Sequence, residues 1–398
     1  MKRDARALEA ALARLDAAQL RRARTTTRAR GTGEGRMLAT EDGRELLDFS
    51  SNDYLGLARH PALAAAMSEC AARTGAGSGA AHLVTGHGEE HARLEEELAA
   101  FTTRERALLF STGYMANLAV ICALAGSGER VLLDRLSHAS LIDGARLSGA
   151  GLRRYAHADA HAAVRLLDAD PRHTALLATD GVFSMDGDLA PLPQLSRAAQ
   201  AANAWLVVDD AHGLGVVGAT GRGVLEHFGL GAAEVPVLVG TLGKAFGSFG
   251  AFVAGGADFI EYLLQKARPY LYTTALPQPV AAATREGLRR AQAESWRRAR
   301  VLALSARFRR AAQAAGVPLS ASTTPIQPVV LGSAAAALSA QRELAEAGFW
   351  VAAMRPPSVP PGGARLRITL SAAHTEAQVD ALAGELAHVC ASARSAPG

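Results

Sequence analysis

Short apolar runs alternate with segments of helical spacing through the middle of the chain. The runs are continuous, which is typical of strands that are buried on both faces of a sheet. They lie at residues 106–110, 130–134, 152–155, 174–179, 205–209 and 237–239. Amphipathic segments such as 140–147 and 195–203 separate several of them. This alternation predicts an α/β fold with a mostly parallel central sheet flanked by helices.

The pattern changes after Pro279. An Ala- and Arg-rich helical stretch runs to about residue 315, and strand, helix and strand segments then lead to a helix at 375–393. An amphipathic helix is also expected at residues 4–24, packed on this C-terminal part. The expected division is an N-terminal helical segment (1–40), a large α/β domain (41–285) and a small C-terminal α+β domain (286–398).

The composition excludes several classes of partner. The 398-residue chain is 49% hydrophobic, and its 42 Lys and Arg residues nearly match 38 Asp and Glu residues, so we expect no nucleic-acid partner. No run of about eighteen apolar residues occurs, and we expect no membrane association. Cys70, Cys122 and Cys390 lie far apart without metal-ligand spacing, which predicts reduced thiols, no metal and a cytoplasmic location.

One glycine-rich loop carries an isolated lysine, Lys244. The loop follows the apolar run at 237–239, and the chain has only two other lysines, Lys2 and Lys266, among many arginines. A lysine amine can lose its proton when it is buried and then act as a nucleophile or Schiff-base partner, whereas an arginine stays protonated. The alternative is an ordinary solvated loop lysine.

A carboxylate and an imidazole follow the apolar run at 205–208. A carboxylate at a buried strand end, Asp209, can keep a proton on a heteroaromatic nitrogen of a cofactor ring. His212 could bond an oxygen on the same ring. The alternatives are a purely structural pair and an Asp-x-x-His metal pair, although no third ligand of fitting spacing stands nearby.

A phosphate site is expected where the strand at 106–110 meets the next helix. The connecting residues 111–117 place free backbone N–H groups at the start of that helix, where the helix dipole favours an anion. A Schiff-base lysine, an acidic ring partner and a phosphate site are what pyridoxal 5′-phosphate (PLP) requires. We therefore expect PLP as the cofactor.

The residues of these motifs and their order along the chain resemble those of the α-oxoamine synthase family of fold-type I PLP enzymes, over nearly the whole chain. The matching stretches are SSNDYLGL (50–57), GYMAN (113–117), DRLSHAS (134–140), GVFSMDG (181–187), VVDDAHG (207–213), TLGKAFG (241–247) and ARLRITLSAAH (364–374). One departure follows Gly247, where Ser248 and Phe249 replace the paired glycines of many members. The resemblance implies a fold-type I transferase with a smaller α+β C-terminal domain.

The resemblance also implies the roles of the residues around the cofactor. Lys244 matches the Schiff-base lysine that moves the α-proton, Asp209 the partner of the pyridine nitrogen, and His138 the residue that stacks on the ring. The other implied cofactor contacts are Ser184 and His212 near the ring oxygen, Gly113 and Tyr114 beside the phosphate, and Thr241 on the phosphate.

Further matches imply substrate contacts. Arg367 resembles the anchor of the amino-acid carboxylate, a role that suits a guanidinium fork. Thr369, Arg21 and His138 match other substrate-binding positions, with Arg21 on the acyl or thioester side. For Arg21 a solvated helix arginine is the alternative.

The family resemblance implies a homodimer, in which the glycine cluster at 75–79 and the threonines at 273–274 complete the partner's phosphate pocket. The segments at 20–22 and 354–360 most resemble the members that condense L-alanine with a pimeloyl thioester in biotin biosynthesis. The acyl carrier would be coenzyme A or acyl carrier protein. Members that use glycine or serine share the catalytic core, so 2-amino-3-ketobutyrate ligase, aminolevulinate synthase and serine palmitoyltransferase activities remain alternatives.

Overall fold

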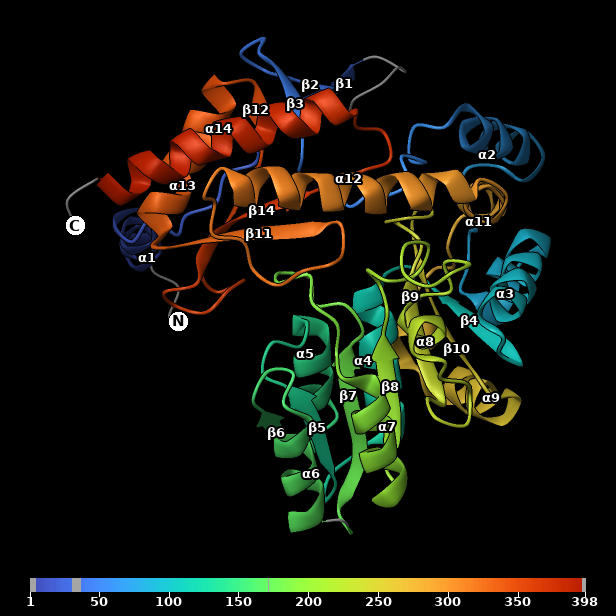
Figure 1. The fold of residues 1–398 in the computed structure, drawn as a ribbon. Helices are drawn as coiled ribbons and strands as arrows, with labels where there is room; N and C mark the ends of the chain where they lie inside the picture. The colour runs from blue at the N-terminus through green and yellow to red at the C-terminus, as the bar shows by residue number, and fades with distance from the viewer. Residues whose placement is uncertain (1–4, 31–36, 171, 396–398) are drawn as a thin grey trace. The chain divides into compact units, whose positions relative to one another are not determined.

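The structure, a computed structural model, describes residues 5–30, 37–170 and 172–395 (Figure 1). Its internal contacts divide the chain into two compact units. We call them the terminal unit, made of the described parts of Met1–Ser51, Met185–Gly187 and Arg300–Gly398, and the central unit, made of those of Asn52–Ser184 and Asp188–Ala299. The three-part domain division expected from the sequence stays a prediction.

The central unit contains one mixed sheet and the helices that pack on it. Its strands are β4 (Arg106–Phe110), β5 (Arg130–Asp134), β6 (Gly151–Tyr155), β7 (Thr174–Asp180), β8 (Trp205–Asp209), β9 (Val237–Thr241) and β10 (Ala251–Gly255). Its helices are α2 (Pro61–Thr74), the π-helix η1 (His82–Gly86), α3 (Glu89–Thr102), α4 (Gly113–Leu124), α5 (Ala139–Leu147), α6 (Ala160–Ala169), α7 (Leu192–Ala201), α8 (Val224–Phe228), α9 (Ala257–Lys266), α10 (Arg268–Leu271) and α11 (Gln278–Ala293).

The strand order of this sheet is β4-β10-β9-β8-β7-β5-β6. The pairs β9–β8, β8–β7, β7–β5 and β5–β6 are parallel, as the continuous apolar runs predict. Strand β10 runs antiparallel to both β4 and β9. The sequence pattern did not predict β10, because its short run lies between glycines directly after the lysine loop.

Both faces of the central sheet are buried. Val131 and Leu133 of β5 and Val239 of β9 belong to the core cluster that α4, α5 and α9 complete. The residues between them, such as Leu132 and Leu238, are just as deeply buried and point to the opposite face. Helices on both faces explain why these strands are apolar throughout instead of alternating.

The terminal unit contains two smaller sheets, with orders β1-β2-β3-β12 and β11-β14-β13. Its elements are α1 (Ala5–Ala17), β1 (Thr27–Arg30), β2 (Met37–Thr40), β3 (Glu45–Asp48), β11 (Ile326–Gly332), α13 (Ala334–Glu346), β12 (Phe349–Trp350), β13 (Ala352–Met354), β14 (Ala364–Thr369) and α14 (Glu376–Ser395). Helix α12 (Ser295–Ala314) contains the boundary between the two units.

Two helices differ from the sequence expectation. The helix expected at 4–24 ends at Ala17, because Gln19 takes a φ of 55° and the N–H groups of Leu20 and Arg21 both turn back to the carbonyl of Leu15. The long stretch expected up to about residue 315 is two helices, α11 and α12. They separate at Glu294, whose ψ of 57° lies outside the helical range.

The loop that carries Lys244 is tied to helix α11. The Ser248 N–H donates to the carbonyl of Leu242 at 3.0 Å, and the Thr284 hydroxyl donates to Ser248 Oγ at 2.7 Å. The Ser248 hydroxyl also lies 3.4 Å from the carbonyl oxygen of Val280. Ser248, which departs from the family pattern, therefore anchors the loop to the helix.

A glycine on α11 allows this close approach. A Cβ atom added at Gly287 would overlap the carbonyl oxygen of Phe246 in the lysine loop, and main-chain atoms have little freedom to move away. Gly384 on α14 is the matched contrast, since a Cβ there would meet nothing within 4 Å.

We expect Gly287→Ala to destabilise the protein by about 1–3 kcal/mol, because overpacking outweighs the better helix propensity of alanine. Gly384→Ala should instead stabilise it by about 0.4–1 kcal/mol. Urea unfolding of the two variants and the parent protein measures both changes. Equal effects of the two substitutions would contradict the proposed packing.

Candidate active site

The lysine amine meets an imidazole at the carboxyl end of the central sheet. Lys244 lies in the loop after β9, and its Nζ atom is 3.0 Å from Nε2 of His212, which follows β8. The hydroxyl of Thr241, at the end of β9, donates to the carbonyl of Ala211 at 3.3 Å. Neighbouring parallel strands end at the same edge, so two residues distant in sequence become partners.

A hydrogen-bonded chain orients His212. Its Nδ1 atom lies 2.7 Å from the hydroxyl of Tyr54, which in turn donates to Oδ1 of Asn52 at 3.2 Å. With the Tyr54 proton directed to Asn52, the imidazole donates from Nδ1 and presents the lone pair of Nε2 to the Lys244 amine. Tyr54 therefore selects the His212 tautomer that accepts a hydrogen bond from Lys244.

Asp209 is a buried carboxylate at the end of β8, with only 6% of its surface exposed. Its Oδ2 atom accepts from the side-chain amide of Asn117 at 2.6 Å, and its Oδ1 atom accepts from the N–H of Ala211 at 3.0 Å. These two donors stabilise a charge that burial alone would disfavour.

The side-chain amide of Asn117 is also connected to His138 through a hydroxyl group. Asn117 also donates to the hydroxyl of Ser140 at 2.8 Å, and that hydroxyl lies 2.7 Å from Nδ1 of His138. The N–H of Ser140 points at the same nitrogen, 3.3 Å away, so Nδ1 is the acceptor and Nε2 carries the proton. Burial lowers the pKa of His138, an effect that the nearby Asp209 opposes and Lys244 assists.

A second carboxyl group, Asp180, lies fully buried at the end of β7. It accepts from the main-chain N–H of His138 at 2.9 Å and so sets the start of helix α5. Burial, and then the charge of Asp209, raise the pKa of Asp180 well above its ordinary value. The raised pKa favours the protonated form of Asp180.

The start of helix α4 lies beside the end of β9. The Thr112 hydroxyl caps the helix by accepting from the Met115 N–H at 3.2 Å. A Cβ atom on Gly113 would lie 2.7 Å from Cγ2 of Thr241, so only glycine fits beside that strand end. Tyr114 is 42% exposed and donates to Asp143 Oδ2 at 2.5 Å, which fixes the first turn of α4.

The residues of the central unit fit PLP. Asn117 Oδ1 is a buried oxygen that has no hydrogen-bond partner among the described residues, next to the Asp209 carboxylate that would meet a ring nitrogen. The helix start at Gly113, with Thr241 beside it, suits the phosphate, and Lys244 offers an amine. We infer that these residues would hold the cofactor.

The structure brings only part of the expected site into one unit. Ser184 is half-buried after β7 in the central unit, with the other expected cofactor residues. Arg21, Arg367 and Thr369 belong to the terminal unit, where Arg367 and Thr369 are buried in β14 and the Thr369 hydroxyl donates to the Phe49 carbonyl at 3.1 Å. Arg21 is exposed and pairs with Asp16 at 2.8 Å. The roles expected for these residues stay predictions.

The sequence analysis did not single out Asn117, Tyr54 or Ser140. These three residues lie inside motifs that match the family, at 113–117, 50–57 and 134–140, so the signal was present. Their roles depend on partners far along the chain, such as the 92-residue separation between Asn117 and Asp209. Asp180 directly follows a predicted strand, which places it at the same edge.

Comparisons with known proteins agree with this geometry. The family described as aminotransferase class I and II matches residues 44–386. The 8-amino-7-oxononanoate synthase of Methylococcus capsulatus is 61% identical over 346 residues, which cover 87% of this chain and 89% of that protein. The chain belongs to the aminotransferase class I and II family.

Solved structures of this family extend the likeness to the backbone. A serine palmitoyltransferase from S. paucimobilis with a bound PLP–myriocin aldimine has a TM-score of 0.90 at 29% identity, covering 98% of both chains. An 8-amino-7-oxononanoate synthase from Francisella tularensis has a TM-score of 0.76 at 32% identity, covering 87% of this chain and 98% of the other. The resemblance to the α-oxoamine synthases and the expected fold class are confirmed.

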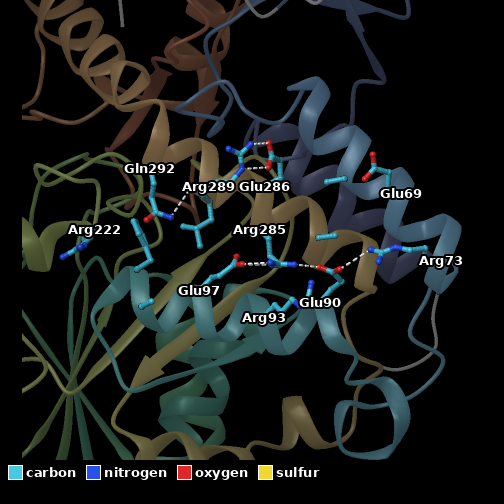
Figure 2. Close-up of a pocket in the computed structure, with 15 residues that line it drawn as sticks. Glu69, Arg73, Glu90, Arg93, Glu97, Arg222, Arg285, Glu286, Arg289 and Gln292 are labelled. Carbon is cyan, nitrogen blue, oxygen red and sulfur yellow. Dashed lines mark hydrogen bonds and ion pairs between the residues drawn. The ribbon is translucent and has the colours of Figure 1, made fainter.

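A cavity of about 630 Å³ lies away from these residues, among α2, α3 and α11 (Figure 2). Arginine and glutamate side chains line its wall and pair with each other. Arg285 contacts Glu90 at 2.7 Å and Glu97 at 2.6 Å, and Arg73 reaches Glu90 at 3.4 Å. No residue of the candidate active site lines this cavity, and its charges already compensate one another.

Three imidazoles, those of His82, His87 and His91, lie close enough to reach one metal ion. The Nδ1 atoms of His82 and His87 are 3.0 Å apart. His91, however, uses both nitrogens, because Nδ1 accepts from the Gly88 N–H at 2.9 Å and Nε2 donates to the Leu276 carbonyl. In this arrangement the three imidazoles form a hydrogen-bonded group. Burial and the other two imidazoles lower the pKa of His82 to about 3.

Another histidine, His157, bridges two carboxylates near the same sheet edge. Its Nδ1 atom lies 3.0 Å from Asp134, at the end of β5, and its Nε2 atom 2.9 Å from Asp188. Burial alone would lower the pKa of His157, but the hydrogen bonds to the two carboxylates outweigh it and raise this pKa to about 10.

We expect this bridge to make stability depend on pH. Because the pKa of His157 is higher in the folded state than its ordinary 6.5, the stabilisation is complete below about pH 6.5 and disappears as the pH rises towards 10. Urea unfolding of the parent and His157→Gln at about pH 6, 7.5 and 9 should give a stability gap that shrinks with pH. His161→Gln, on the exposed side of α6, is the matched control. A gap that stays constant with pH would show that the imidazolium is not the source.

Proposed function

We propose that this chain catalyses the PLP-dependent condensation of L-alanine with a pimeloyl thioester, on coenzyme A or acyl carrier protein, with loss of CO2. The product is 8-amino-7-oxononanoate, a biotin precursor, and the carrier thiol is released. The observation that carries the proposal is the contact of 3.0 Å between Lys244 Nζ and His212 Nε2, at the sheet edge where Asp209 is buried. The high identity to the Methylococcus capsulatus synthase supports this particular reaction.

PLP, when bound, supplies a sink for the electrons that remain on the amino-acid α-carbon after a bond to it breaks. Lys244 would bind the cofactor covalently through Nζ and would remove and return the proton of that carbon. His212 orients this amine through its Nε2 lone pair. Asp209, held by Asn117, would keep a proton on the pyridine nitrogen. The family match and the palmitoyltransferase with bound PLP support this choice of cofactor.

The remaining roles concern the two substrates. Arg367 would bind the carboxylate of L-alanine, and its burial in β14 would strengthen such a charge pair. His138 would contact the substrate as well as the ring, and Thr369 the substrate. For Arg21 the ion pair with Asp16 competes with any substrate anion.

The proposal is tested by turnover with defined substrates. L-alanine, glycine and L-serine are assayed against pimeloyl-, succinyl-, acetyl- and palmitoyl-CoA, and we expect the highest kcat/KM for L-alanine with pimeloyl-CoA. A pocket distinguishes one methyl group by about 1–3 kcal/mol, so the margin over glycine should be roughly 10–200-fold.

Lys244→Ala is the matched control for this assay. It should abolish turnover and the exchange of the alanine α-proton with solvent deuterium, while circular dichroism stays unchanged. Retained turnover in Lys244→Ala would refute the role of the lysine. A preference for glycine with acetyl- or succinyl-CoA would refute the choice of substrates but not the PLP chemistry.

A serine palmitoyltransferase-like reaction is the second candidate. The higher TM-score of that structure favours it, but backbone likeness does not identify an acyl chain, which side chains recognise. The sequence identity is 29% for that enzyme and 61% for the Methylococcus capsulatus synthase. The substrate panel separates the two reactions directly.

We also propose that the protein acts as a homodimer that completes the site. The π-helix beside the glycine cluster exposes Leu83 and Val84, by 51% and 73%, and Tyr272 beside the threonines at 273–274 is 72% exposed. Large apolar side chains with this exposure favour burial against another chain.

Light scattering at assay concentration should therefore report twice the chain mass of 41.3 kDa. Val84→Glu should shift the population towards monomer and lower activity together, since a buried charge opposes the contact. Leu147→Glu, at a residue that is 67% exposed on α5, is the comparison outside this surface. A fully active monomer would contradict the proposal.

A cytoplasmic location is part of the same proposal. It rests on the wide spacing of Cys70, Cys122 and Cys390, between which the structure has no disulfide. As a separate finding, no helix among the described residues has the length and apolar content needed to cross a membrane.

A further inference from the structure

Three hydrogen bonds connect Asp209 to His138 within the central unit. The side-chain nitrogen of Asn117 donates to Oδ2 of Asp209 at 2.6 Å and to Oγ of Ser140 at 2.8 Å. The Ser140 oxygen lies 2.7 Å from Nδ1 of His138. We call these four side chains the carboxylate–imidazole chain.

The carboxylate end fixes the direction of every bond in this chain. An ionised carboxylate can only accept, so Asn117 must present its NH2 group to Asp209, and the second hydrogen of that group goes to Ser140. The hydroxyl of Ser140 then has its own hydrogen left for Nδ1 of His138. A neutral imidazole has one donor and one acceptor, so the ring proton lies on Nε2. The charge of Asp209 thus selects a tautomer of a side chain beyond its own reach.

The orientation of the Asn117 amide supports this direction. Its Oδ1 atom is buried without a hydrogen-bond partner among the described residues. An unpaired buried carbonyl oxygen is costly, and turning the amide over would instead direct this oxygen towards the Asp209 carboxylate. The charge of Asp209 therefore imposes an orientation that leaves the amide oxygen unsatisfied.

Helix capping is the competing explanation for the state of His138. Its Nδ1 atom also caps α5 by accepting from the main-chain N–H of Ser140, at 3.3 Å. Capping alone would make Nδ1 the acceptor, without any part for Asn117 or Asp209. It predicts that the Ser140 hydroxyl and the charge of Asp209 leave the imidazole unchanged. The contact with the hydroxyl is shorter, at 2.7 Å.

We propose that Asn117 and Ser140 are positioning residues through which the charge of Asp209 holds His138 in its Nε2–H tautomer. The inference rests on the proposed function, which assigns Asp209 to the pyridine nitrogen and His138 to the ring and the substrate. In this tautomer His138 would offer a donor, and not a lone pair, to a substrate oxygen. One charge would then set both the ring proton of the cofactor and the hydrogen bond offered to the substrate.

The first test compares Ser140→Ala with Ser137→Ala in the holoenzyme. Ser137 lies in the same loop, and its buried hydroxyl has no partner among the described residues, so its removal is the matched control. Nitrogen-15 NMR of histidine-labelled protein separates protonated from unprotonated ring nitrogens, and His138→Gln identifies the signals among the 12 histidines. We expect an unprotonated Nδ1 in the parent and in Ser137→Ala. In Ser140→Ala the Nδ1 signal should move and the second tautomer should become populated.

The second test asks whether the charge acts through the chain. Asp209→Asn introduces a group that can also donate, which releases the Asn117 amide, so the His138 signals should change as they do in Ser140→Ala. Combining the two substitutions should then add no further change. Asn117→Ala breaks the chain at an earlier link and should reproduce the effect of Ser140→Ala on His138. It also provides a reading if Ser140→Ala does not fold.

Turnover gives an independent measurement. We expect kcat/KM for L-alanine with pimeloyl-CoA to fall about tenfold in Ser140→Ala, the effect of one impaired hydrogen bond to a charged group, and to stay within about twofold in Ser137→Ala.

A protonated Nδ1 in the parent would overturn the inference. So would His138 signals that stay unchanged in Ser140→Ala or in Asp209→Asn, as helix capping predicts. An Asp209→Asn change that persists in full beside Ser140→Ala would also overturn it, because the charge would then act directly on the imidazole. Absence of pimeloyl-CoA turnover in the parent would instead refute the proposed function, and the NMR result does not depend on that turnover.

Discussion

The buried carboxylate of Asp209 imposes the main constraint on the central unit. A charge at the end of β8 is costly unless donors reach it, and among the described residues the Asn117 side-chain amide is one such donor. Asn117 must therefore sit in the first turns of α4, and the same amide ties Ser140, at the start of α5, to His138. Helices α4 and α5 are thus connected to the end of β8 through one charge. The carboxylate that would tune the cofactor thus also organises the pocket that would receive it.

The lysine loop depends on a different constraint, close main-chain packing. Gly287 allows α11 to approach the carbonyl of Phe246, and Ser248 is tied to the same helix through Thr284. The backbone on either side of Lys244 is therefore held, while the amine itself meets His212. A rigid loop keeps the amine in reach of its partner, which is the geometry that proton transfer requires.

In the terminal unit, two arginines that are neighbours in sequence have different kinds of partner. Arg21 forms an ion pair with Asp16, whereas Arg22 contacts the Pro356 carbonyl and the Ser358 hydroxyl, which are neutral groups of a distant segment. The end of α1 at Ala17 causes this difference, because the chain turns at Gln19 and the two side chains no longer follow a helix.

The sequence by itself determined the strands of the parallel sheet and the family, and it predicted Lys244, Asp209 and His212 as site residues. These predictions follow from local patterns. A buried strand has a continuous apolar sequence, and ligands of such sheets bind at the carboxyl ends of the strands. Only the tertiary structure decided that Asn117 contacts Asp209, that Tyr54 contacts His212, that β10 is antiparallel to its neighbours, and that Arg22 contacts Ser358. Each of these depends on residues far apart in the chain, and a local pattern contains no information on which distant side chain completes a hydrogen bond or leaves a charge without a partner.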